Sequence, residues 1–115
     1  MKTNDSISTG ALLPAVAHRL EQAVDYADGS VVSRTILKTK AGTITLFAFD
    51  TGQELSEHSA PFDAFVQILD GKTQLTIGGK PIIAKAGETV IMPANVPHAV
   101  NAVSRFKMLL TMIRG

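Results

Sequence analysis

The feature that most constrains this chain is a series of short apolar runs, each closed by a glycine or by another turn residue. Runs rich in β-branched and apolar residues cover 31–38, 43–49, 64–69, 73–77, 81–84, 88–92, 97–100 and 105–113. Short strands at this spacing are typical of an all-β barrel or sandwich. No segment between the runs has the pattern of a crossover helix, which argues against a parallel α/β sheet.

Two local signals refine this prediction. Residues 73–77 alternate between polar and apolar side chains and end at Gly78-Gly79, which predicts a tight hairpin into the next run. Asp70-Gly71 closes the run before them, which predicts a turn between two separate strands.

The first 30 residues have a different pattern and are expected to form an N-terminal extension to a barrel of residues 31–115. Residues 1–10 are small and polar, which predicts a loose tail. Leu12, Leu13, Val16 and Leu20 lie at helical spacing and predict a short helix, with Pro14 in its first turn. The extension is expected to contribute this helix and an edge strand.

Charge and composition argue against several classes of function. The 115 residues include 11 basic and 10 acidic ones, scattered along the chain, and aromatic residues are limited to five Phe and one Tyr. Binding of nucleic acid needs a concentrated basic face or a stacking platform, so it is not expected. There is no cysteine, which removes disulfides and thiolate sites. No apolar stretch has membrane-spanning length, and no signal peptide is evident. We therefore expect a cytoplasmic protein without membrane partners.

The last apolar run predicts contacts on both of its faces. Phe106, Met108, Leu110 and Met112 share one face, and Leu109 and Thr111 share the other. A chain of this length leaves much of its surface exposed, so pairing with a second copy would stabilise it. We expect one face in the core, the other in an interface, and a homodimer.

Two segments each contain a glycine followed by a histidine, Gly52 with His58 and Gly87 with His98, and they resemble the paired motifs of the cupin superfamily. In the first motif Gly52, His58 and Gly71 match, whereas Ala60 and Ala64 replace the family's second histidine and its glutamate.

In the second motif Gly87, Pro93 and His98 match the family pattern. Asn95 stands where the family has glycine, an exchange that the backbone tolerates because asparagine also adopts positive φ. Ala102 occupies the position of the final asparagine.

The resemblance covers residues 42–113 and implies a small single-domain cupin: an RmlC-like, double-stranded β-helix (jelly-roll) barrel. In the family, three histidines and a glutamate hold a divalent transition metal. Only His58 and His98 remain here, so the ligand set is degenerate and any such metal is expected to be weakly held. Asp63 is the nearby carboxylate that could face the site or point away from it.

Two classes of function follow from this resemblance and stay open. The first is a non-catalytic barrel that binds a small organic ligand, because replacement of polar ligands by alanine leaves a larger and more apolar pocket. Its candidate contacts are His58, His98, Phe62, which with Phe65 flanks the Ala64 position, and Met108, which belongs to a Met-lined wall. The second is an enzyme: a metal-dependent oxygenase or isomerase with an incomplete ligand set, or a metal-free, epimerase-like enzyme in which a histidine transfers a proton.

Overall fold

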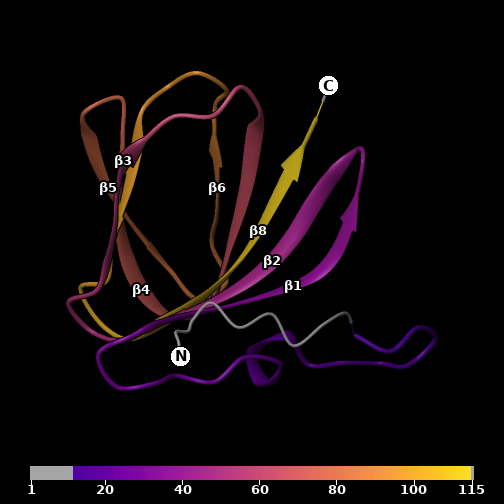
Figure 1. Cartoon of the computed structure of the whole chain (residues 1–115). Helices are drawn as coiled ribbons and strands as arrows, with labels where there is room; N and C mark the ends of the chain where they lie inside the picture. The colour runs from indigo at the N-terminus through magenta and orange to yellow at the C-terminus, as the bar shows by residue number, and fades with distance from the viewer. Residues whose placement is uncertain (1–11, 115) are drawn as a thin grey trace.

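The computed structural model describes residues 12–114, and its eight strands curl into a barrel (Figure 1). A 3-10 turn, η1 (Leu20–Gln22), precedes the strands. The strands are β1 (Val31–Thr39), β2 (Gly42–Phe49), β3 (Glu54–His58), β4 (Asp63–Ile77), β5 (Lys80–Lys85), β6 (Thr89–Met92), β7 (His98–Asn101) and β8 (Phe106–Ile113). All the paired strands are antiparallel, which confirms the all-β barrel expected from the sequence.

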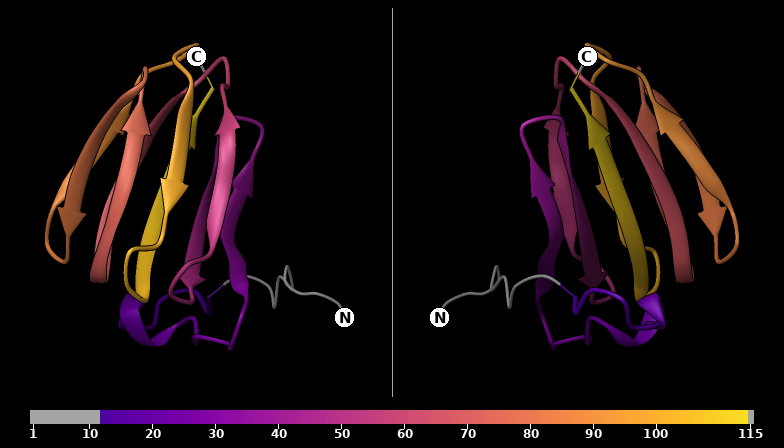
Figure 2. Two further views of the ribbon diagram at one scale, coloured as in Figure 1. Left: turned by 90° about the vertical axis from the view of Figure 1, so that its left-hand side faces the viewer. Right: turned by 90° about the vertical axis from the view of Figure 1, so that its right-hand side faces the viewer.

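Strand β4 connects the two layers of the barrel, which lie on opposite sides in Figure 1 and are each seen face-on in Figure 2. Its first half lies between β8 and β6, and its second half lies between β5 and β7. The predicted turn at Asp70-Gly71 is wrong, because β4 runs through these residues with only a register shift between Ile68 and Asp70. Gly71 has a φ of +70°, and a Cβ here would collide with the carbonyl of Arg105. Glycine is therefore what allows one strand to serve both layers.

The core fills the space between the layers. Alternate residues of β4 (Ala64, Val66 and Ile68) point into it, while their neighbours point outward, as the two-residue period of a strand requires. The other buried members of this core are Phe49, Leu75, Ala84, Met92, Val100, Ala102, Phe106 and Met108. The inner face of β8 thus lies in the core, as predicted.

The segment before β1 does not form the predicted helix. Residues 14–16 form a turn in which Ala15 has a φ of 61°, a conformation that breaks a helix, and only η1 is helical between residues 12 and 30. No strand occurs in this range either, and the sheet edge is provided by β1. The tail predicted for residues 1–10 lies outside the described residues. In the described part of the chain, no helix is long and apolar enough to cross a membrane.

Instead of folding as a helix, this segment covers part of the outer face of the barrel. Val24 is buried against Leu46 and Ala48 of β2 and Leu109 of β8, with Leu20 at the edge of the same cluster. The amino group of Lys107 donates a hydrogen bond to the carbonyl of Glu21. The outward face of β8 is therefore covered, in part, by the chain's own N-terminal segment.

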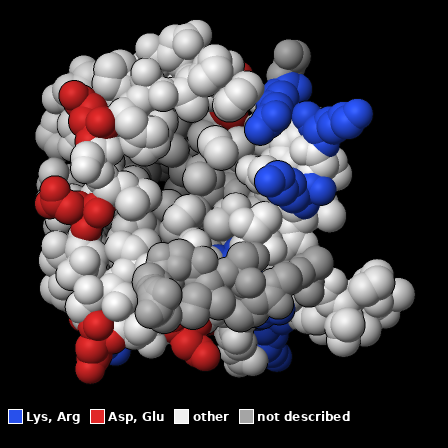
Figure 3. Space-filling view, in the orientation of Figure 1, with Lys and Arg blue, Asp and Glu red and all other residues white. Residues whose placement is uncertain are grey.

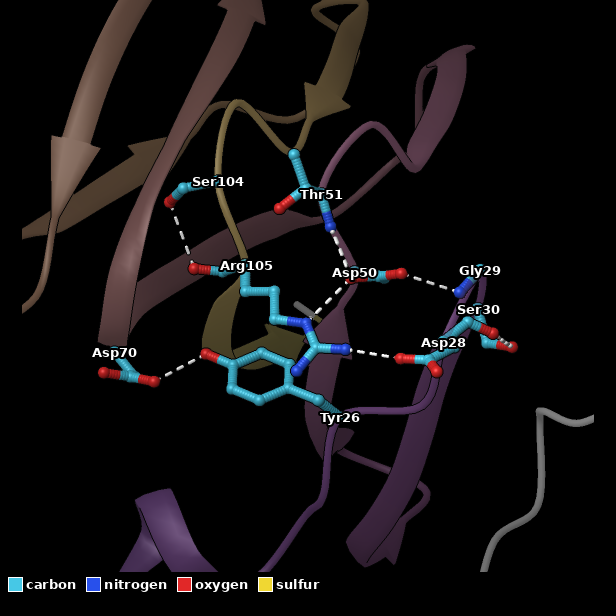
Figure 4. Close-up of polar contacts among 9 residues, drawn as sticks. All are labelled: Tyr26, Asp28, Gly29, Ser30, Asp50, Thr51, Asp70, Ser104 and Arg105. Carbon is cyan, nitrogen blue, oxygen red and sulfur yellow. Dashed lines mark hydrogen bonds and ion pairs between the residues drawn. The ribbon is translucent and has the colours of Figure 1, made fainter.

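A polar cluster fastens this segment to the barrel (Figure 4). The guanidinium of Arg105 binds the carboxylates of Asp50 at 2.8 Å and Asp28 at 2.7 Å. Tyr26 donates a hydrogen bond of 2.6 Å to Asp70, and burial together with this bond raises the pKa of the phenol. Arg105 also lies over the Tyr26 ring, 5.2 Å from its centre. Residues far apart in the sequence are thus held together beneath the barrel.

Candidate functional site

Two histidines meet where β3 ends and β7 begins. Residues His58 and His98 are direct partners in the pairing of these two strands. Their rings lie edge to face, with centroids 4.4 Å apart. His98 is only 7 % exposed, whereas His58 faces solvent. We call these two residues the histidine pair, and they are the two family ligand positions that the sequence retains.

Each ring is anchored through the same nitrogen. Nδ1 of His58 lies 2.9 Å from the carbonyl oxygen of Ser56, and Nδ1 of His98 lies 3.3 Å from that of Val96. A carbonyl oxygen can only accept a hydrogen bond, so Nδ1 carries the proton in both rings. In the neutral form the lone pair then lies on Nε2, which is the atom that can accept a hydrogen bond, bind a metal or take up a proton.

The electrostatic surroundings keep His98 neutral. Burial is the main cause that lowers its pKa, and the nearby charge of His58 lowers it further, while the hydrogen bond to Val96 acts in the opposite direction. An imidazole whose pKa is lowered from its usual value near 6.5 is uncharged at neutral pH. His98 therefore presents a hydrogen-bond acceptor at Nε2 and no positive charge.

The surroundings of the histidine pair are mostly apolar. On the side away from His58, His98 pairs with Ile77 of β4. Leu55 and Val100 form the neighbouring pair between β3 and β7. Both Leu55 and Ile77 pack against the barrel core. The space-filling view is hollowed near the middle of this side of the molecule, between β3 and the strands of the opposite layer (Figure 3).

The substituted motif positions have structural roles. Ala64 is buried in the core, and the carbonyl of Ala60 accepts a 2.8 Å hydrogen bond from the backbone N–H of Asn95. This bond joins the two motif loops. Asn95 has a φ of 65°, so the expectation that it takes over the glycine conformation is confirmed. Neither alanine side chain offers a polar atom to a ligand.

The residues present do not make a complete metal site. No group of three or more His, Cys, Asp or Glu side chains gathers anywhere within residues 12–114. Asp63 does not join the histidine pair: its carboxylate accepts a 2.8 Å hydrogen bond from the N–H of Ala94, and it borders an outer groove with Phe65. Two imidazoles supply only half of a four-coordinate set.

The other two candidate contacts lie elsewhere in the fold. Met108 is 1 % exposed and packs within the barrel core, on the inner face of β8. Phe62 lies in the loop between β3 and β4, half-buried, with the guanidinium of Arg114 5.3 Å from its ring centre. That these side chains contact a ligand stays a prediction.

Sequence reasoning missed the residues that orient the histidine pair. The carbonyls of Ser56 and Val96 belong to the backbone, and no side chain marks them. Strand β3 itself was missed, because Glu54–His58 contains no β-branched residue. A signal did exist: histidines at both motif positions imply that their strands are neighbours.

Comparison with known proteins places this geometry in a family. The model of the cupin domain family matches residues 45–113. No curated protein matches the chain.

Three solved structures illustrate the similarity. A conserved Streptococcus pyogenes protein of unknown function is 36 % identical over 97 % of this chain and 98 % of its own, with a TM-score of 0.88. A cupin 2 conserved barrel domain protein from Leptotrichia buccalis is 40 % identical over 82 % of this chain but only 46 % of its own (TM-score 0.80). An RmlC-like cupin from Desulfovibrio desulfuricans is 30 % identical over 85 % of this chain and 95 % of its own (TM-score 0.74).

Proposed function

The chain belongs to the cupin domain family and has its RmlC-like, double-stranded β-helix fold, and we propose that it binds a small organic ligand at the histidine pair without a resident metal. The observation that carries this proposal is the shared anchoring of the two rings through Nδ1, which in the neutral rings leaves both Nε2 atoms free to accept a hydrogen bond, on rings whose centroids lie 4.4 Å apart. The fold alone would not justify it, because one fold hosts many activities.

The chemistry of the pair specifies the kind of ligand. Two Nε2 lone pairs accept hydrogen bonds, so the ligand should carry a donor such as a hydroxyl or an amine. Its remaining surface should be apolar, because Leu55 and Ile77 lie beside the pair. Exposure of His58 gives the ligand a route from solvent, while the burial of His98 strengthens the polar contact that it makes.

Binding without catalysis agrees best with how the rings are held. A histidine that takes up a proton during a reaction is commonly stabilised by a carboxylate on its other nitrogen. Here that partner is a neutral carbonyl for both rings, and the lowered pKa of His98 disfavours its protonated form. Epimerase-like proton transfer is therefore the weaker alternative.

A weak metal site is the second candidate. Unprotonated Nε2 atoms on neighbouring strands are also suited to a divalent transition metal. Water or the organic ligand would have to supply the remaining positions, as in a metal-dependent oxygenase or isomerase with an incomplete ligand set. We further propose that the protein acts in the cytoplasm.

The proposal is tested by calorimetric titration with a defined panel: monosaccharides, primary amines and hydroxy acids, then Mn²⁺, Ni²⁺ and Zn²⁺. We expect one of the organic compound classes to bind the wild type. His58→Ala and His98→Ala should each raise the dissociation constant about tenfold or more, because a hydrogen bond between neutral groups is worth about 1 kcal/mol and its loss leaves the donor of the bound ligand unpaired. His18→Ala is the matched control, because His18 is exposed and hydrogen-bonded to the carbonyl of Leu13, outside both motifs. Binding of metals alone, lost in the two site variants, would contradict the proposal.

A further inference from the structure

The layer of the barrel opposite the histidine pair has an inner wall that stays open to solvent. Thr45 of β2 pairs with Leu110 of β8, and Leu110 pairs with Val66, which is buried in the core, so all three lie on the inner face. Thr45 and Leu110 are nevertheless only half-buried. The space-filling view shows the molecule hollowed on this side (Figure 3). A ligand at the histidine pair would therefore also meet this wall.

One row of side chains on this wall ends in a lysine. Lys38 of β1 pairs with Thr43 of β2, and Thr43 pairs with Met112 of β8. Met112 in turn pairs with Ala64, which is buried in the core, so the row lies on the inner face. A register shift earlier in β1 is what turns Lys38 to this face. Because Lys38 is exposed, it lies where the inner wall meets solvent.

A second lysine ends the row that contains the histidine pair. His98, the partner of His58, also pairs with Ile77 of β4. Ile77 packs against the core and pairs with Lys80 of β5, so Lys80 shares the face of the two histidines. Neighbouring strands lie about 4.8 Å apart, so the backbones of His98 and Lys80 are about 10 Å apart. Lys80 is exposed, and its side chain can reach toward the histidines along Ile77.

The row that ends in Lys38 lies at the same end of the barrel as the histidine pair. After His58 the chain runs through a short loop to Asp63, which pairs with Ile113 at the end of β8. The backbone N–H of the next residue, Arg114, donates a 2.7 Å hydrogen bond to the carbonyl of Ala41, in the turn between β1 and β2. This turn, the end of β8 and the loop after β3 lie together at the upper end of the barrel in Figure 1. The two lysines and the two histidines therefore surround one opening.

The charge in the two rows is of one sign. Within residues 12–114 the only ion pairs are those of Arg105, so no acidic side chain described there neutralises Lys38 or Lys80. No acidic residue takes part in either row, and Asp63 borders a groove on the outer face. Figure 3 shows basic side chains beside the hollow, on the side of β1, β2 and β8. Positive charge around an opening attracts an anion.

We propose that the ligand of the histidine pair is a small organic anion with a hydroxyl group, whose anionic end is attracted by Lys38 and Lys80. This inference rests on the proposed function. The lone pair on Nε2 of a neutral imidazole accepts a hydrogen bond from a hydroxyl, whereas it repels a carboxylate or phosphate oxygen. The anionic end therefore turns away from the histidines and toward the ammonium groups. Ile77, between His98 and Lys80, offers an apolar contact to the carbon skeleton.

Two hydroxyl groups of the opposite wall agree with such a ligand. Thr35 and Thr45 are cross-strand partners on the inner face, and their hydroxyl oxygens lie 3.4 Å apart. A threonine hydroxyl both donates and accepts a hydrogen bond. This pair can therefore donate to the anionic group of the ligand or bind a further hydroxyl on it.

The test uses pairs of compounds that differ mainly in charge: lactate and 3-phenyllactate, each with its neutral amide, and glucose 6-phosphate with glucose. Calorimetry measures the dissociation constants for the full chain as wild type, Lys38→Glu, Lys80→Glu, Lys85→Glu and His98→Ala. Lys85→Glu is the matched control, because Lys85 is exposed on the same strand as Lys80 but pairs with Lys72, outside both rows. It changes the net charge by the same amount as the other two lysine variants. Circular dichroism melting establishes that each variant is folded.

We expect the wild type to bind at least one anion about fivefold or more tightly than its neutral partner. Lys38→Glu and Lys80→Glu should each raise the dissociation constant of that anion about fivefold or more, because each replaces an attraction by a repulsion, and Lys85→Glu should not. The compound pairs distinguish a carboxylate from a phosphate.

Two results would overturn the inference and leave the proposed function intact, provided that His98→Ala still weakens binding. One is a neutral compound that binds as tightly as its anionic partner. The other is an anion whose binding is unchanged in both Lys38→Glu and Lys80→Glu. Binding that His98→Ala does not weaken, or no binding of any compound, would contradict the proposed function as well. If one of the two lysine variants fails to fold, the other still tests the inference from the opposite layer.

Discussion

His58 and His98 are cross-strand partners whose imidazole rings lie edge to face, 4.4 Å apart, because β3 and β7 pair these two residues directly. The pairing brings together histidines that are 40 positions apart in the sequence. It also lowers the pKa of His98, in addition to the larger effect of burial, because two protonated imidazoles at this distance repel each other.

The first prediction concerns that coupling. In NMR titrations, the pKa of His98 should lie below the usual value near 6.5, with burial as the larger cause and His58 as the smaller one. His58→Ala should raise the pKa of His98 without restoring the value of an ordinary histidine, because the burial remains. An unchanged pKa in that variant would show that the two rings do not interact.

The second prediction follows from the direction of the same shift. Since folding lowers the pKa of His98, the unfolded chain binds the proton more readily as pH falls through about 6.5. The contribution of neutral His98 to stability is thus complete above that pH and declines below it. Urea unfolding should show the stability difference between wild type and His98→Gln shrinking between pH 7.5 and 5.5. His18→Gln is the control. A stability difference between wild type and His98→Gln that grows as the pH falls from 7.5 to 5.5 would contradict a lowered pKa for His98.

The third prediction tests the strand that serves both layers. Gly71→Ala should be severely destabilising, well beyond about 2 kcal/mol, since it combines a positive φ with a collision against the backbone of Arg105. Gly79→Ala is the matched control: its φ is +80°, but a Cβ there would meet no atom within 4 Å. It should cost only about 1–2 kcal/mol from backbone strain. Equal losses of unfolding free energy in the two variants, measured by chemical denaturation, would show that β4 is not tightly packed against Arg105 at Gly71.

The fourth prediction concerns the cluster beneath the barrel. The hydrogen bond from Arg105, followed by that from the N–H of Gly29, lowers the pKa of Asp50 to about 2. Its stabilising contribution is therefore complete above the usual value near 3.8 and is lost as pH falls from there toward 2. Asp50→Asn should be less stable than wild type at pH 7, and the two melting temperatures should converge near pH 2. Asp25, an exposed aspartate, provides the control as Asp25→Asn.

Much of the fold was predictable because its signals are local. The Gly78-Gly79 hairpin was confirmed, and β1 and β2 have nearly the predicted bounds. Errors arose where tertiary contacts override local preference. Asp70-Gly71 reads as a turn, yet the pairing of β4 with four other strands keeps it extended. The apolar spacing of residues 12–20 suggested a helix, yet the positive φ of Ala15 breaks it, Leu13 and Val16 stay exposed, and Leu20 packs against the sheet.

The sequence predicted which side chains form the site, but not the backbone groups that orient them. The motif spacing indicated His58 and His98, and the structure brings both together. Which nitrogen faces a ligand depends on the carbonyls of Ser56 and Val96, whose positions follow from the strand ends and not from residue type. The direction of Asp63 was open in the sequence for the same reason, and the hydrogen bond to Ala94 resolves it.

The central claim is that the histidine pair presents two unprotonated Nε2 atoms to an organic ligand. A long-range ¹H–¹⁵N NMR spectrum of the imidazole rings at pH 7.5 tests it most directly, because it distinguishes protonated from unprotonated nitrogens at each ring. The account predicts Nδ1–H tautomers for His58 and His98, with Nε2 resonances that shift on addition of an organic class from the panel while those of His18 do not. Nε2–H tautomers at both rings, or Nε2 shifts produced by metal ions alone, would contradict it.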